Sequence, residues 1–104
     1  MASVYTTGEW FAKDGEEDAF VDAWAEFAAW AASQPGAGTL RLTRDLSSPA
    51  RFVSFGEWET LDQVHAWKSS PDFRERMGRV QQHVAAFHPA ELAEVRAAGH
   101  MTTA

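Results

Sequence analysis

Hydrophobic residues recur along this chain at two spacings, one typical of strands and the other typical of helices. Short apolar or alternating runs predict four strands, over residues 4–12, 39–45, 51–58 and 91–96. Apolar residues three or four positions apart predict one helix between the first two strands and another between the last two. The predicted order of elements is therefore β-α-β-β-α-β, with no internal repeat, low-complexity tract or linker.

The first predicted helix has a start signal, a stop signal and one apolar stripe. Asp14, with Glu17 three residues later, has the spacing of a capping box, and Pro35-Gly36 ends the helix. The stripe consists of Phe20, Trp24, Phe27, Ala28 and Ala31. We expect this stripe to pack against the sheet.

The second predicted helical segment starts at one cap and restarts at another. Thr60 and Gln63 form a second capping box, and Ser70-Pro71 supplies a further cap followed by proline at the first helical position. An apolar stripe then runs through Phe73, Met77, Val80, Val84 and Phe87. The stripe predicts a helix that continues until His88-Pro89 stops it.

This order of elements predicts an α+β, ferredoxin-like βαββαβ fold with a four-stranded antiparallel sheet. Right-handed crossovers place the two predicted helices on one face of that sheet. The strand over 51–58 is apolar on both faces, with Val53 and Phe55 opposite the helices. Because an apolar sheet face is rarely left in water, we expect a second copy to cover it and form a homodimer.

Composition limits the classes of protein to which the chain can belong. Its 104 residues fit a single domain over 1–104, with a core of about residues 3–97 and a flexible tail over 98–104. A formal charge of −6 argues against nucleic acid and anionic membranes as partners. The absence of cysteine excludes disulfides and thiolate chemistry. Without a signal-peptide pattern or a membrane-spanning apolar run, we expect a cytoplasmic protein.

Aromatic residues are more informative than charge in this chain. Five Trp and seven Phe occur in 104 residues. They either make a bulky core or line a cavity for a flat, apolar ligand, and the composition leaves both interpretations open. Metal-ligand spacing is absent, since no two His stand three or four residues apart.

The segment 52–79 carries a family resemblance. Its strand ends in Glu57-Trp58-Glu59-Thr60, its helix holds Trp67, and Ser70-Pro71-x-Phe73 restarts the helix. With the order of elements, this resembles the antibiotic biosynthesis monooxygenase (ABM) domain family. The resemblance implies a dimeric α+β barrel. It also implies cofactor-free oxygenation of aromatic polyketides or quinols, haem degradation, or isomerisation.

The resemblance separates these activities residue by residue. Haem-degrading members pair the tryptophan at Trp58 with an Asn and a His, but Met77 stands at the His position and the chain has no asparagine. The resemblance therefore argues against haem degradation. Polyketide-oxidising members also use this tryptophan, with an Asn at the position of Ser54 and a Tyr at that of Val64.

The sequence thus predicts a cofactor-independent monooxygenase that oxidises a small aromatic substrate with O2. Trp58 and His65 are the candidate catalytic residues, with His65 as a base, although a purely structural role for this histidine remains open. The candidate substrate-binding residues are Phe52, Ser54, Trp67 and Met77. The main alternatives are a non-catalytic binding or sensing module and an isomerase or cyclase on the same barrel, and a haem-binding protein is a minor third.

Overall fold

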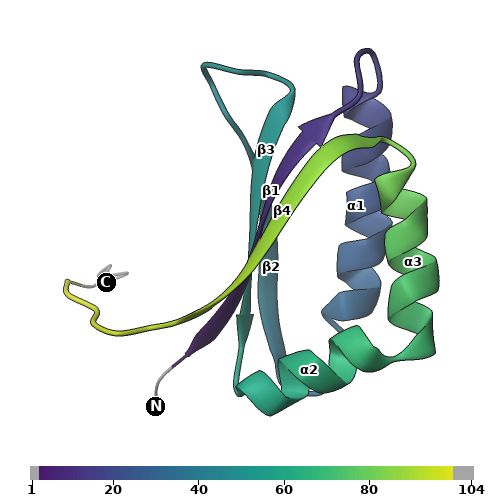
Figure 1. The fold of residues 1–104 in the computed structure, drawn as a ribbon. Coiled ribbons are helices and arrows are strands. Elements are labelled where there is room, and N and C mark those ends of the chain that lie inside the picture. The colour runs from purple at the N-terminus through teal and green to yellow at the C-terminus, as the bar shows by residue number, and fades with distance from the viewer. Residues whose placement is uncertain (1–2, 100–104) are drawn as a thin grey trace.

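One antiparallel sheet and a layer of helices make up the fold (Figure 1). The computed structural model describes residues 3–99. Within them the strands are β1 (Val4–Ala12), β2 (Ala37–Arg44), β3 (Arg51–Trp58) and β4 (Val84–Ala93). The helices are α1 (Glu17–Ala31), α2 (Leu61–Ser69) and α3 (Pro71–Gln81). The strand order β2-β3-β1-β4, antiparallel throughout, confirms the predicted ferredoxin-like α+β class.

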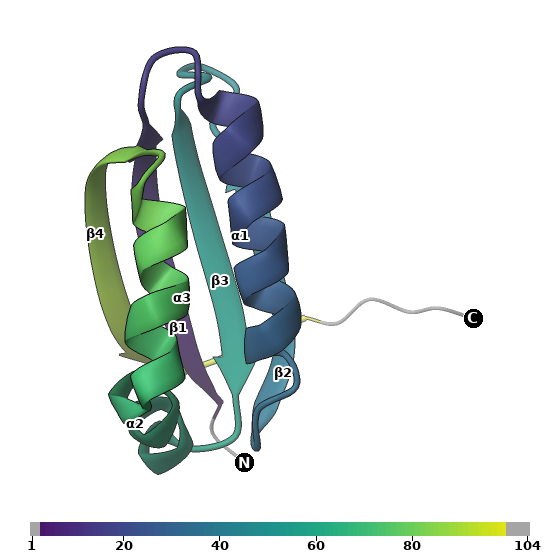
Figure 2. The ribbon, with the colours of Figure 1, turned by 90° about the vertical axis from the view of Figure 1, so that its right-hand side faces the viewer.

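The helices cover one face of the sheet, as Figure 2 shows with α1 and α3 in front of the strands. Strand alternation turns Trp10, Phe52 and Trp58 toward these helices, and all three are buried. The stripe predicted for α1 is also confirmed, because its five residues are the buried residues of that helix. The core therefore lies between the helices and the inner face of β1 and β3.

The predicted end of the second helical segment is wrong. Helix α3 ends at Gln81, and Val84 and Phe87 lie in β4, which pairs with β1. Residues three apart lie on opposite faces of a regular strand, so their spacing favours a helix, but a β-bulge where β4 passes Phe11 and Ala12 lets both pack against the core. Packing decides between the two, because Phe87 stacks on Trp10 with ring centroids 3.9 Å apart. Pro89 is tolerated because β4 is an edge strand of this sheet.

Other predicted element boundaries also differ from the observed ones. The last strand ends at Ala93 rather than continuing to residue 96, and His88 lies on β4 rather than at a helix terminus. Helix α1 begins at Glu17, and Glu16 rather than Asp14 is its N-cap, without a side-chain capping bond. Residues 98–99 have no regular structure, and the rest of the predicted flexible tail lies outside the described residues.

The predicted caps of the other helices are confirmed. Thr60 Oγ1 accepts the backbone N–H of Gln63 at 3.1 Å, and Ser70 Oγ accepts that of Phe73 at 3.2 Å. Ser70 and Pro71 divide the helical segment, so the described residues contain three helices rather than two. No helix of residues 3–99 is long and apolar enough to cross a membrane.

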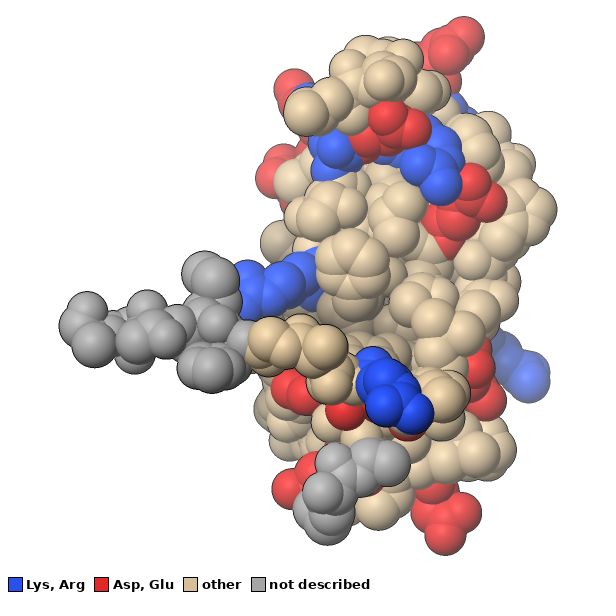
Figure 3. All heavy atoms as spheres, turned by 90° about the vertical axis from the view of Figure 1, so that its left-hand side faces the viewer, with Lys and Arg blue, Asp and Glu red and all other residues tan. Residues whose placement is uncertain are grey.

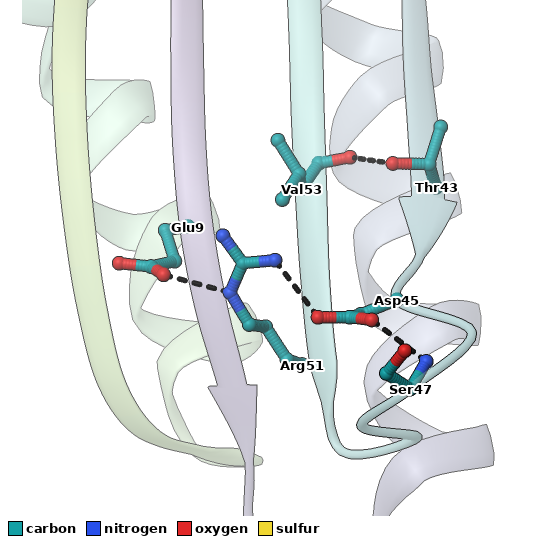
Figure 4. Close-up of polar contacts among 6 residues, drawn as sticks. All are labelled: Glu9, Thr43, Asp45, Ser47, Arg51 and Val53. Carbon is teal, nitrogen blue, oxygen red and sulfur yellow. Dashed lines mark hydrogen bonds and ion pairs between the residues drawn. The ribbon is translucent and has the colours of Figure 1, made fainter.

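On the outer face, an ion-pair network ties β1, β3 and the turn after β2 (Figure 4). Arg51 Nε donates to Glu9 at 2.7 Å, and Arg51 Nη1 donates to Asp45 at 3.0 Å. The Ser47 backbone N–H and the Arg51 guanidinium together hold the pKa of Asp45 below its ordinary value. The network fixes one end of the sheet.

Candidate functional site

A cavity of about 230 Å³ lies between the inner face of the sheet and the helices. Its lining is dominated by aromatic rings, among them Trp10, Trp24, Phe27, Trp67, Phe73 and Phe87. These rings come from β1, α1, α2, α3 and β4, so the cavity exists only once all these elements have packed. A small, mostly apolar molecule matches such a lining.

Trp67 organises one wall of this cavity. Its ring stacks on Trp58 with centroids 4.7 Å apart and 30° between the planes. Phe73 meets Trp67 edge-on, at 4.9 Å and 88°. The Ser70 hydroxyl donates to the Trp67 carbonyl at 2.8 Å, while its oxygen accepts the N–H of Phe73. The junction between α2 and α3 thus fixes the positions of the Trp67 and Phe73 rings.

The sheet side of the cavity contains a short motif that occurs twice. Residues 6–10 read Thr-Thr-Gly-Glu-Trp and residues 54–58 read Ser-Phe-Gly-Glu-Trp, so a hydroxyl residue precedes Gly-Glu-Trp by two positions in both. In the β1–β3 ladder Thr6 lies opposite Gly56, and Gly8 lies opposite Ser54. The motif is short and its copies are far apart in the chain, so it does not amount to an internal repeat of the fold.

Each copy of the motif supplies an indole to the hydroxyl of the other. Trp10 Nε1 donates to Ser54 Oγ at 2.9 Å, and Trp58 Nε1 donates to Thr6 Oγ1 at 3.2 Å. An indole N–H can only donate, so each hydroxyl oxygen acts as the acceptor in its pair. Both Ser54 and Thr6 line the cavity.

The two glycines make room for these pairs. A Cβ on Gly8 would lie 2.7 Å from Trp10 Nε1 and 3.0 Å from Ser54 Oγ. A Cβ on Gly56 would lie 2.9 Å from Thr6 Oγ1 and 3.3 Å from Trp58 Nε1. A side chain at either position would therefore push an indole away from its hydroxyl.

A charged group stands at the helix α2 side of the cavity. Lys68 lines the cavity, and its Nζ donates to Glu91 Oε2 at 3.0 Å. His65 Nε2 lies 3.1 Å from the other carboxylate oxygen of Glu91. Lys68 first, and His65 second, lower the pKa of Glu91 below its ordinary value. Within residues 3–99, no group of three or more His, Asp or Glu side chains could hold a metal ion.

The structure brings some of the predicted site residues together and separates others. Ser54, Trp67 and Met77 line the cavity. Trp58 and Phe52 are fully buried but do not line it, since Trp58 lies behind Trp67. The ring of His65 is outside the lining and 54% exposed. The predicted roles of these residues stay predictions.

The lining residues with polar groups that were missed from sequence include Thr6, Trp10 and Lys68. The repeated Gly-Glu-Trp was the available signal for Thr6 and Trp10, because it marks two equivalent positions on paired strands. Lys68 shares its side of α2 with His65, but only the packing of α2 against β4 shows which of them reaches the cavity.

A family model described as antibiotic biosynthesis monooxygenase matches residues 3–79. The chain belongs to this family. The match spans β1 to most of α3, and so includes both copies of the Gly-Glu-Trp motif and the α2–α3 junction. A comparison with curated proteins found no match.

Solved structures similar to this ABM-family chain share its fold at low sequence identity. A variant of SnoaB, a cofactor-independent oxygenase from Streptomyces nogalater, superposes with a TM-score of 0.84 and 18% identity over 91% of this chain and 95% of that one. A protein from Deinococcus radiodurans, assigned as an antibiotic biosynthesis monooxygenase, gives 0.83 and 17%, over 95% and 99%. Another from Bordetella bronchiseptica gives 0.81 and 21%, over 94% and 100%.

Proposed function

We propose that the protein is a cofactor-independent oxygenase that oxidises a small phenol- or quinol-like aromatic molecule with O2. The observation that carries this proposal is the aromatic cavity of about 230 Å³ with the Ser54 and Thr6 hydroxyls in its lining. Membership of the ABM family supports an oxygenase-type reaction. SnoaB, a structural neighbour, is described as a cofactor-independent oxygenase.

Cavity size favours a compact substrate. Sites for drug-sized ligands generally measure about 300–1,000 Å³. At about 230 Å³, this cavity lies just below that range and suits a molecule of few fused rings. Flat rings would stack against Trp10 and Trp67, which present aromatic faces or edges from the sheet and from α2.

The substrate itself supplies the electrons in this proposal. A phenol or enol that has lost its proton passes an electron to O2 far more readily than the neutral molecule. For a ring CH2 oxidised to a carbonyl, one oxygen atom enters the product and the other leaves as water with the two hydrogens. The protein's part is to hold the anion, exclude bulk water and keep the reacting carbon accessible to O2.

We assign the proton-handling role to the Lys68–Glu91–His65 group. Lys68 lines the cavity and can attract a developing phenolate, while His65 stands at the solvent side of the same carboxylate. His65 remains the proposed base, with the proton reaching it through the groups at the cavity edge rather than by direct contact. Trp58 remains in the proposed site by supporting Trp67 and Thr6.

We also propose that the protein is a homodimer joined through the outer face of the sheet, as a cytoplasmic enzyme. Phe55 and Leu92 on this face are 40% and 49% exposed. Figure 3 shows an uncharged area over the middle of the face, with Lys, Arg, Asp and Glu side chains around it. Covering such a face with a second copy removes apolar surface from water.

Oxygen consumption tests the proposed reaction. A panel of anthrones and naphthols is offered to the parent protein, Trp58→Phe and His65→Ala, with His83→Ala as the matched histidine control. His83 is paired with Glu16 at the start of α1, away from the cavity. We expect O2 uptake by the parent and by His83→Ala, with slower turnover in the other two variants. Equal turnover in all four proteins would remove the site assignment.

The same panel separates the two main alternatives. Anaerobic conversion of a substrate would favour an isomerase or cyclase. Saturable binding with no O2 uptake, followed by quenching of the tryptophan fluorescence, would favour a binding or sensing module. The lining contains Trp10, Trp24 and Trp67, so a bound aromatic ligand should change this fluorescence.

A further inference from the structure

The two indole–hydroxyl pairs on the sheet give the cavity a floor made of hydrogen-bond donors. We propose that Trp10 and Trp58 position the hydroxyls of Ser54 and Thr6 to donate to a ligand oxygen, so that the cavity binds a phenol or enol as its anion. This inference rests on the proposed function, because it concerns the same cavity. It adds a positioning role for Trp10, extends that of Trp58, and adds a preference for one protonation state of the ligand.

The first step is the direction of the hydrogen bonds. Each indole donates, at 2.9 Å from Trp10 to Ser54 and at 3.2 Å from Trp58 to Thr6. The hydroxyl oxygens accept these bonds and keep their own hydrogens for another partner. Within residues 3–99 neither hydroxyl donates a hydrogen bond, although Ser54 is only 8% exposed. A ligand oxygen in the cavity would supply the acceptor.

A third donor lies in the same lining. Trp67 is 6% exposed, and its indole N–H has no hydrogen-bond partner within the described residues. Buried polar groups in folded proteins nearly always have a partner, so an unpaired one beside a cavity points to a ligand. Ser54, Thr6 and Trp67 thus offer three donors on the sheet and α2 sides of the cavity.

The charges around the cavity favour an anion over a neutral ligand. Among the lining residues, β1, β2, β3, β4, α1 and α3 contribute no titratable side chain, and α2 contributes Lys68. The carboxylate that Lys68 contacts, that of Glu91, is also bound by His65. Hydrogen bonds to an ionised acceptor are roughly twice as strong as those between neutral groups. The donor-rich lining therefore stabilises a phenolate more than its parent phenol.

Binding of 4-nitrophenol without O2 tests this inference, because its anion absorbs visible light and its neutral form does not. We expect binding to the parent protein to lower the apparent pKa of the ligand by about one unit, a tenfold preference for the anion. Ser54→Ala and Thr6→Val should each remove part of this shift. Ser54→Thr, which keeps the hydroxyl, should retain it.

Trp10→Phe tests positioning rather than direct contact. It keeps an aromatic ring but removes the N–H that holds Ser54. We expect it to reduce the ligand's pKa shift while leaving the affinity for 4-nitroanisole, which has no acidic proton, nearly unchanged. A merely structural role would weaken the binding of both ligands equally.

Three results would overturn the inference. The parent protein could bind neutral 4-nitrophenol more tightly than its anion, or it could fail to bind 4-nitrophenol at all. The third result is that Ser54→Ala and Thr6→Val both keep the full shift in the ligand's pKa. Near-UV circular dichroism of every variant identifies those that have lost the native packing, and Thr6→Val is the near-isosteric choice. Since no turnover is involved, a normal shift without O2 uptake would instead count against the proposed oxygenase function alone.

Discussion

Trp10 on β1 donates its indole N–H to the hydroxyl of Ser54 on β3, at 2.9 Å across the two central strands. The bond needs Gly8, because a Cβ there would occupy the space between the indole and the hydroxyl. Trp58 and Thr6 repeat the relationship beside Gly56. The sheet face of the cavity is therefore built from two equivalent units.

Gly8→Ala should separate Trp10 from Ser54. The new Cβ would lie 2.7 Å from Trp10 Nε1 and 2.9 Å from the ring of Phe87, in a well-packed region. We expect a loss of about 1–3 kcal/mol in the free energy of unfolding, the usual cost of overpacking. Urea denaturation followed by tryptophan fluorescence measures it. An unchanged midpoint would show that the indole moves aside freely.

Gly78→Ala is the matched control and should have the opposite effect. Gly78 is exposed in α3, and a Cβ there meets no atom within 4 Å. Alanine loses less backbone entropy on entering a helix, so we expect a gain of about 0.5–1 kcal/mol. The same urea experiment applies. If Gly78→Ala were destabilising instead, α3 would have to contact another molecule at this position.

Phe55→Glu should disrupt the proposed dimer. Phe55 lies on the outer face of β3, and an ionised carboxylate buried between two copies would be strongly unfavourable. We expect sedimentation velocity to show a dimer for the parent and a monomer for the variant. Leu46→Glu is the control, because Leu46 is 98% exposed in the turn after β2. A parent protein that sediments as a monomer would contradict the dimer.

The Glu91 carboxylate should make stability depend on pH in the acid range. Its pKa in the folded protein is lowered from 4.5 by Lys68 and His65. A lowered pKa gives stability that is present above the unfolded-state value and lost as the pH falls through the folded-state value. We therefore expect the parent to exceed Glu91→Gln in urea midpoint at pH 7, and the gap to close below about pH 4.5. If the difference in urea midpoint between the parent and Glu91→Gln increased in acid, the lowered pKa of Glu91 would be contradicted.

Local signals in the sequence determined much of the fold. The caps at Thr60 and Ser70 and the apolar stripe of α1 depend on neighbouring residues alone, so they could be identified before any packing was known. The order of elements then led to the ferredoxin-like class through the handedness of crossovers. Ser54, Trp67 and Met77 were placed near a common site by one continuous segment.

Tertiary structure decided the rest, because those features depend on strands that are distant in the chain. Phe87 fits a helix or a strand until Trp10 stacks on it. The Gly-Glu-Trp motif has no apparent meaning until antiparallel pairing sets Thr6 opposite Gly56. Lys68 and His65 are equivalent in sequence, yet packing against β4 places only Lys68 in the cavity lining. The periodicity of apolar residues indicates which face of an element is buried, but which residues pack against that face depends on contacts between distant parts of the chain.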